Sequence, residues 1–244
     1  MVNTVITEVD IIMLRSMLSG GLTFQEALMQ VLAVVMVVFL ILPIHELAHG
    51  FVAYKLGDNT AKNNGRLRFN PMAHVDPIGA LMILFVGFGW AKPVPVDPRN
   101  FKNPKTGMAL TSLAGPVSNL ICAFLGALIN QILYILAVGQ ILSSAIYTPL
   151  AIFFAYFVSI NISLAVFNLI PIPPLDGSKI LFAFLPDKIV YKIYQYEQII
   201  NLLLIVLICM GALTGPLSFF TNLVLDGIYN LTDLICSPLF SLLV

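Results

Sequence analysis

Long apolar runs separated by short polar stretches dominate the hydrophobic pattern of this chain. A helix needs about 20 apolar residues to cross a bilayer, and several runs reach that length. The pattern therefore predicts an all-α polytopic membrane protein with about five transmembrane helices, within a range of roughly four to six. The candidate spans are residues 26–54, 107–139, 147–170 and 197–214, with a weaker one at 217–242 that contains Asp226 and Asp233.

The apolar stretch at residues 79–90, GALMILFVGFGW, is too short to cross a membrane. A helix of that length would extend only about 18 Å. Irregular backbone at membrane depth is tolerated where it is buried in protein or lines a cavity. We therefore expect a re-entrant loop or a short β-hairpin near residues 79–97.

The first 24 residues do not follow the charged, apolar, small-residue pattern of a signal peptide. Residues 10–19 instead predict a short amphipathic helix at the membrane surface. Thr23 and Glu26 have the spacing of a capping box, which would start the first long helix. The expected organisation is a surface segment at 1–24 followed by a single membrane-embedded domain at 25–244.

Composition agrees with a membrane protein and narrows the function classes. Hydrophobic residues make up 59% of the chain and charged residues 10%, whereas a soluble domain carries about 25% charge. The mean hydropathy is +0.96. The formal net charge is zero, so no basic surface suggests nucleic acid as a partner. The cysteines lack the spacing of a metal site and are expected to be buried free thiols: Cys122, Cys209 and Cys236.

Lysine and arginine residues are concentrated in two loops. By the positive-inside rule, both loops are expected in the cytoplasm. The first helix would then enter the cytoplasm, and the successive spans would alternate in direction. The loop residues are Lys55, Lys62, Arg66, Arg68, Lys92, Arg99, Lys102 and Lys105 in the first, and Lys179, Lys188 and Lys192 in the second.

The motif HELAH, residues 45–49, directly follows fourteen uninterrupted apolar residues. His45 and His49 are four residues apart, so both imidazoles face one side of a helix and can bind one metal ion. Glu46 stands where the water-activating base of a zinc protease belongs. Ionisable residues are costly inside a membrane, which favours a functional site over a packed polar patch. Pro43 is expected to kink the helix just before the motif.

A catalytic zinc site usually has three protein ligands, so the two histidines leave the site incomplete. The best third candidate is Asp176, in the sequence NLIPIPPLDG at residues 168–177. The prolines of that segment prevent a regular helix and predict a loop at membrane depth. In isolation, Asp176 would be interpreted as a helix-capping residue before Gly177. His74, the remaining histidine, is expected to stabilise a turn, with a second-shell or gating role near the zinc as the alternative.

Together these motifs resemble the site-2 protease family of intramembrane zinc metalloproteases, in its compact prokaryotic branch without PDZ or CBS domains. The resemblance runs from about residue 40 to 186 and is carried by five motifs in order: HELAH, YKLGDNTAKNNGRLRFNPMAHVDPIGA, FGWAKPVPVDPRNF, LAGPVSNL and PPLDG. It implies that His45, His49 and Asp176 bind one Zn²⁺ per chain and that Glu46 is the catalytic base. It also implies that Asn168 holds the substrate carbonyl or the oxyanion, although a structural role for Asn168 is equally open.

The resemblance further implies a multi-pass protein of the prokaryotic cell membrane, and the basic loops predict that its active site lies toward the cytoplasmic side. The expected partners are the lipid bilayer and a transmembrane protein substrate with a single span. The substrate helix must unwind before it is cut, and the extended edge beginning at Trp90 is a candidate clamp by strand addition. Asn119 could line the substrate path or pack between helices.

Two other functions compete with proteolysis. Histidine and aspartate within helices could carry Zn²⁺ across the membrane, but the candidate ligands cluster at one depth and no chain of further ligands continues outward. A non-catalytic membrane scaffold could retain the fold. It would have no need of Glu46, so the intact glutamate favours the enzyme.

Overall fold

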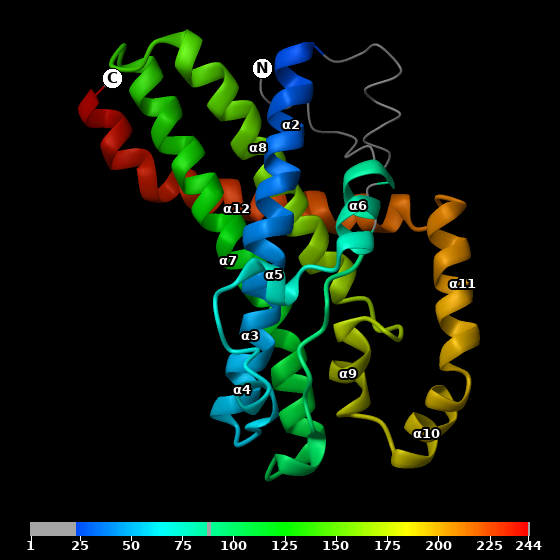
Figure 1. Ribbon diagram of the computed structural model, residues 1–244. Helices are drawn as coiled ribbons and strands as arrows, with labels where there is room; N and C mark the ends of the chain where they lie inside the picture. The colour runs from blue at the N-terminus through cyan, green and yellow to red at the C-terminus, as the bar shows by residue number, and fades with distance from the viewer. Residues whose placement is uncertain (1–22, 87–88, 244) are drawn as a thin grey trace.

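The computed structural model describes residues 23–86 and 89–243, and within these ranges it is a bundle of helices (Figure 1). The predicted surface helix at 10–19 lies outside the described residues. The first long helix consists of α2 (Phe24–Met36), a π-helical turn η1 (Val37–Ile41) and α3 (Leu42–Lys55). The other elements are α4 (Thr60–Asn63), α5 (Pro71–His74), α6 (Pro77–Val86), η2 (Pro98–Asn100), α7 (Pro104–Val138), α8 (Ser144–Asn168), α9 (Asp176–Phe182), α10 (Asp187–Gln195), α11 (Glu197–Cys209) and α12 (Thr214–Leu243).

The start of α2 confirms the capping box. The Thr23 backbone N–H donates to Glu26 Oε2 over 2.8 Å, and the Glu26 N–H donates to Thr23 Oγ1 over 3.3 Å. Further along, the π-helical turn ends just before Pro43, where Leu42 donates its N–H to Val37. Because Pro43 has no N–H and crowds the preceding turn, the helix widens at this point instead of ending.

Four helices are long and apolar enough to cross a membrane: Phe24–Lys55, Pro104–Val138, Ser144–Asn168 and Thr214–Phe240. These correspond to four of the five predicted spans. The remaining span, predicted at 197–214, overlaps α11, which follows α10 after a short break with a bend of 66°. Lys188 and Lys192 lie on α10, so its polar face favours the membrane surface over the apolar interior. The protein is thus multi-pass, with four or five spans.

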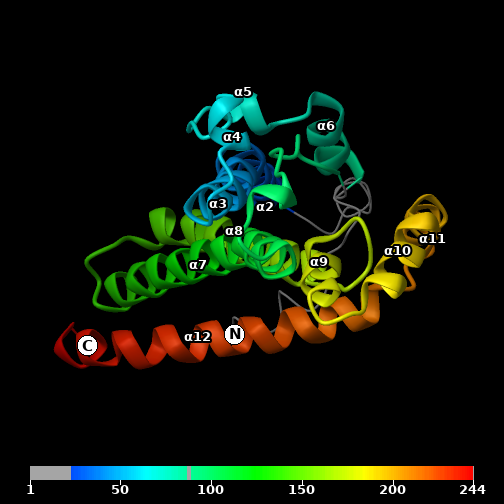
Figure 2. The same cartoon turned by 90° about the horizontal axis from the view of Figure 1, so that it is seen from below.

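Helix α7 lies at the centre of the bundle and contacts α3, α8, α9 and α12. Small residues allow the close approach of α7 to α8: Ala123 and Ala127 are fully buried, and a Cβ on Gly126 would lie 2.7 Å from the ring of Phe157. Small residues at helix contacts are typical of membrane bundles. Helix α12 contacts both α7 and α8 and runs crosswise to α2 and α3, which Figure 2 shows nearly end-on.

The described residues near 79–97 do not form the β-hairpin that the sequence offered as one alternative. Helix α6 occupies its first part, and the described residues after it return in an extended conformation with one isolated bridge, Val75 to Ala91. A Cβ on Gly79 would collide with the backbone carbonyl of Trp90, so the helix and the return pack backbone against backbone. Pro93 and Pro95 have no N–H to give to a regular ladder. These features explain why a helix and an extended return replace paired strands.

Candidate metal centre

Two histidines of α3 face one another on the side of the helix that points into the bundle. His45 and His49 are 6% and 9% exposed, and their ring centroids are 4.6 Å apart in an edge-on arrangement. The spacing of four residues in a regular helix places both rings on one face, as the sequence predicted.

Asp176 reaches the same point from the other half of the chain. Its Oδ2 atom lies 3.4 Å from His45 Nε2 and 3.2 Å from His49 Nε2. Asp176 is the first residue of α9, directly after the loop that contains the prolines. The next residue, Gly177, packs against the backbone carbonyls of Leu169 and Ile170, where a Cβ would collide with both. This close approach turns the loop back toward α3 and brings Asp176 to the histidines.

The carboxylate of Asp176 is suited to bind a cation. Burial alone would raise the pKa of Asp176, but hydrogen bonds from His45 and His49 outweigh it and hold that pKa well below its usual range. Lys179 adds a positive charge, with Nζ 3.6 Å from Asp176 Oδ1. The carboxylate therefore remains ionised, which is the form that binds a metal ion.

Helix α7 supports the histidines from behind. His49 Nδ1 lies 2.7 Å from the carbonyl oxygen of Thr111, and an imidazole can approach a carbonyl in this way only by donating its N–H. The Nε2 atom of His49, which faces Asp176, is then the ring nitrogen left to bind a metal ion. A carbonyl partner of this kind commonly orients a metal-binding histidine. Gly115 lies against both rings, where any Cβ would be 2.5 Å from His45 Nε2.

The three side chains fit a zinc ion by the chemistry of their donors. One atom from each of His45, His49 and Asp176 lies within 4.8 Å of the others. Two imidazole nitrogens and a carboxylate oxygen are a common catalytic zinc set, which leaves a fourth position for water. Among the described residues this is the one group of histidine, cysteine and acidic side chains close enough to share a metal.

Glu46 follows His45 in α3 and is 9% exposed. Its Oε2 atom accepts a hydrogen bond of 2.9 Å from the backbone N–H of Val94, in the extended return after α6. Among the described residues no second hydrogen bond holds this carboxylate, so its other oxygen is available to a water or a substrate.

A cavity of about 840 Å³ opens beside these groups. Helices α2, α3, α8, α11 and α12 contribute to its wall, together with the extended return. Trp90, which is 47% exposed, is part of this lining. The side chains that could do chemistry at the cavity include His45, Glu46, His49, Asn168, Asp176 and Lys179.

Asn168 is the last residue of α8 and lines the cavity. Its amide Nδ2 donates to the carbonyl of Leu164, one turn earlier, over 2.9 Å. The donor expected to face an oxyanion is therefore engaged within its own helix in this structure.

Two other predicted candidates lie away from the cavity lining. His74 is fully buried, with Nε2 3.1 Å from the carbonyl of Arg68, and burial lowers the pKa of its imidazole. This is the geometry of a turn-stabilising residue. Asn119 is fully buried on α7, one turn beyond Gly115, and neither of its amide atoms has a partner among the described residues. It lies between helices, and the two roles that the sequence offered for it both stay predictions.

Sequence reasoning did not identify three contributors to this site: the Thr111 carbonyl, the Val94 N–H and Gly115. Two of these are backbone groups. Every residue has a backbone carbonyl and every residue except proline has an N–H, so residue identity carries no signal for them. Gly115 did carry a signal, because a glycine next to Pro116 inside an apolar helix suggests close approach by a neighbour.

Known proteins resemble this chain in sequence. Residues 128–211 match the profile of peptidase family M50, a stretch that includes Asn168 and Asp176. A protein of Bacillus subtilis named "Putative zinc metalloprotease YwhC" is 43% identical over 195 residues, which cover 80% of this chain and 88% of that protein. "Putative zinc metalloprotease Rip2" of Mycobacterium tuberculosis is 28% identical over 176 residues, covering 70% and 64% respectively. No solved structure matches the chain.

These relatives are named as zinc metalloproteases, and zinc fits the donor set that the fold assembles. The match to YwhC runs over most of both chains. The protein therefore belongs to peptidase family M50, the site-2 protease family, and zinc is its cofactor.

Proposed function

We propose that this protein is an intramembrane endopeptidase that hydrolyses peptide bonds within or near transmembrane segments of other membrane proteins. The supporting observation is the position of Glu46 and its neighbouring histidines. They lie within an apolar helix of 32 residues, Phe24–Lys55, and beside a cavity between spans. A protease with its base at this depth is suited to a substrate that also lies in the membrane.

Each residue of the site has a distinct role in the proposed reaction. His45, His49 and Asp176 hold the zinc ion, which when bound would supply a Lewis acid that lowers the pKa of a water molecule. Glu46 accepts the proton of the attacking water at the oxygen that Val94 does not use. It then passes the proton to the leaving amine. The Val94 N–H keeps the carboxylate turned toward the cavity during both steps.

Asn168 is proposed to stabilise the negative charge that develops on the substrate carbonyl. Its amide lines the cavity. Rotation about a side-chain bond would move the amide N–H from the Leu164 carbonyl to the substrate oxygen. An amide donor in a dry site is worth about 100- to 1,000-fold in rate.

The substrate is proposed to be a transmembrane helix, most simply one of a single-span protein. Its peptide bonds are accessible only after local unwinding, because an intact helix uses its own N–H and C=O groups. The extended backbone at Ala91, between Trp90 and Lys92, could pair with such a segment by strand addition. Lys92 itself is engaged, because its N–H donates to His74 and its carbonyl accepts from Arg66. Pro93 and Pro95 offer no N–H, and the Val94 N–H between them is taken by Glu46.

The active site is proposed to lie toward the cytoplasmic side of the prokaryotic cell membrane. His45 precedes Lys55 by ten residues, which is about 15 Å along a helix. Lys55 opens the loop that holds most of the basic residues, and such loops remain in the cytoplasm.

The test is a pair of matched substitutions on the same helix. Wild type, Glu46→Gln and Glu26→Gln are each expressed beside a tagged single-span substrate in membranes. The wild type and Glu26→Gln should release the cleaved product, because Glu26 only caps α2. Glu46→Gln should release none, since an amide cannot accept the proton. Cleavage that persists in Glu46→Gln would overturn the mechanism. Uptake of zinc into vesicles by a wild type that cuts nothing would instead support a transporter.

A further inference from the structure

The extended return at residues 91–100, called the strap below, lies directly on the helix that carries Glu46. Val94 packs over Gly50, where an added Cβ would be 3.1 Å from Val94 Cγ1 and 2.8 Å from Leu67 Cδ2. Gly50 is one turn beyond Glu46, so the missing side chain lets the strap approach α3 closely. The Val94 N–H can then reach Glu46 Oε2 at 2.9 Å.

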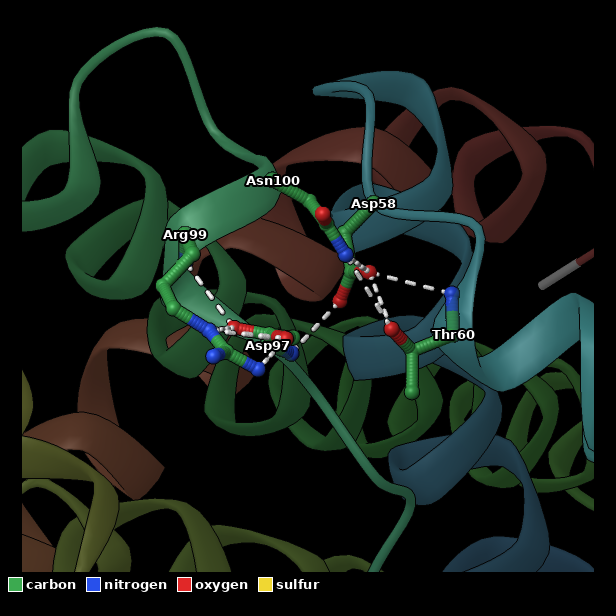
Figure 3. A network of polar contacts seen from close by, with 5 residues as sticks. All are labelled: Asp58, Thr60, Asp97, Arg99 and Asn100. Atoms are coloured by element: carbon green, nitrogen blue, oxygen red, sulfur yellow. Dashed lines mark hydrogen bonds and ion pairs between the residues drawn. The ribbon is translucent and has the colours of Figure 1, made fainter.

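Asp58 holds one end of the strap (Figure 3). Its carboxylate is fully buried, and its Oδ2 atom accepts the backbone N–H of Asp97 over 2.8 Å. Its Oδ1 atom accepts the Asn100 amide over 2.7 Å, together with the backbone N–H and hydroxyl of Thr60. A buried carboxylate is costly unless it is hydrogen-bonded, so four donors around it define a rigid point.

That rigid point belongs to the Glu46 helix itself. The Asp58 backbone N–H donates to the carbonyl of Ala53 in the last turn of α3, over 2.9 Å. The strap is therefore fastened to α3 at two places, through Val94 at Glu46 and through Asp97 at Asp58.

The other end of the strap is held by separate contacts. The Lys92 N–H donates to the His74 carbonyl over 2.8 Å, and Arg66 Nη2 donates to the Lys92 carbonyl over 2.7 Å. Between the two ends, Pro93 and Pro95 restrict the backbone torsions on either side of Val94. The position of the Val94 N–H is thus determined by the anchors at both ends of the strap, together with the packing of Val94 over Gly50.

We propose that Asp58 is a positioning residue for the reaction: by fixing the strap on α3, it holds the Val94 N–H against Glu46 and keeps the carboxylate aimed at the attacking water. This inference rests on the proposed function, in which Glu46 is the base. It also gives a role in the reaction to Asp58, a buried carboxylate with several hydrogen bonds that is not one of the metal ligands.

The test compares three variants of the full-length protein in detergent micelles, with a single-span peptide carrying a fluorophore and a quencher as substrate. Asp58→Asn keeps the shape but turns an NH₂ group toward an N–H donor, so it loosens the strap. Asn100→Ala removes one donor and is the milder variant. Arg99→Ala is the matched control, because Arg99 is 88% exposed and pairs only with the Asp97 side chain. The measurements are zinc per chain, kcat, KM and the quenching of Trp90, the single tryptophan, by acrylamide.

Asp58→Asn is expected to keep its zinc and to lose kcat by about 10- to 100-fold, with KM changed by less than about 3-fold. Asn100→Ala should fall between Asp58→Asn and the wild type, while Arg99→Ala stays within about 2-fold of the wild type. Trp90 should become more accessible to acrylamide in Asp58→Asn and stay unchanged in Arg99→Ala, because Trp90 leads into the strap.

A folded Asp58→Asn protein with wild-type kcat would overturn the inference. So would a loss of kcat that merely follows a loss of zinc, since that indicates general unfolding. If Asp58→Asn does not fold, Asn100→Ala decides, and unchanged kcat there counts against the inference. A wild type that cuts no substrate contradicts the proposed function, and Trp90 quenching then decides the role of Asp58 alone.

Discussion

Gly115 of α7 lies against the imidazole of His49 so closely that a Cβ placed on the glycine would be 2.5 Å from Nε2. The same Cβ would be equally close to His45 Nε2. One hydrogen atom in place of a methyl group therefore determines how near α7 can approach the two candidate ligands.

Gly115→Ala should consequently displace both histidines. We expect the affinity for zinc to fall by about 10- to 100-fold, the loss typical when support behind a metal-binding histidine is disturbed. Zinc per chain, measured after dialysis against a graded series of chelator concentrations, gives the affinity. Gly227→Ala on α12 is the matched control, because nothing lies within 4 Å of the Cβ that it adds. Equal zinc retention in both variants would show that the histidines do not hold the metal.

Substitutions of Asp176 and His74 are expected to have opposite effects on zinc content. Asp176→Ala removes the carboxylate that faces both imidazoles, so zinc should be lost at chelator concentrations that the wild type withstands. His74→Gln should retain zinc in the folded fraction, since His74 contacts the Arg68 carbonyl and is not part of the cavity lining. Metal analysis of the monodisperse fraction checks both. Zinc kept in Asp176→Ala and lost in His74→Gln would contradict the ligand assignment.

The buried carboxylate of Asp58 should make the folding stability of the protein depend on pH. Burial opposes ionisation, but hydrogen bonds from Thr60, Asn100 and Asp97 outweigh it, so the pKa of Asp58 lies below its ordinary value. A carboxyl group with a lowered folded-state pKa stabilises the protein above its unfolded pKa, about 3.9. That contribution is lost as pH falls through the folded pKa.

Asp58→Asn should therefore lower the free energy of unfolding by about 2 kcal/mol, or the thermal midpoint by roughly 4 to 8 °C. The difference from the wild type should be constant between about pH 5 and 8 and should shrink below about pH 4. Thermal midpoints in micelles at several pH values measure it. A difference that grows on acidification would contradict the ionised state of Asp58.

Much of the fold was accessible from the sequence. Apolar runs and the Thr23 capping signal depend on local composition, so they predicted the four spans and the start of α2. The β-hairpin alternative was wrong. The backbone contact between Gly79 and Trp90 forms only in the tertiary structure, so the sequence pattern does not predict it. The span predicted from residue 197 begins where α11 begins, but α10 before it was not predicted. A window of apolar residues does not reveal that the preceding helix is amphipathic and turns aside at Tyr196.

The sequence by itself determined the class of protein and the candidate ligands. Periodicity placed His45 and His49 on one face, and the incomplete ligand set together with the proline-containing loop before residue 176 singled out Asp176. Only the tertiary structure decided what surrounds them: the Thr111 carbonyl behind His49, the Val94 N–H on Glu46, and the close approach of Gly115. The physical reason is that residue identity specifies the chemistry of a side chain, whereas backbone groups are common to nearly all residues. Their roles arise only when packing brings distant segments together.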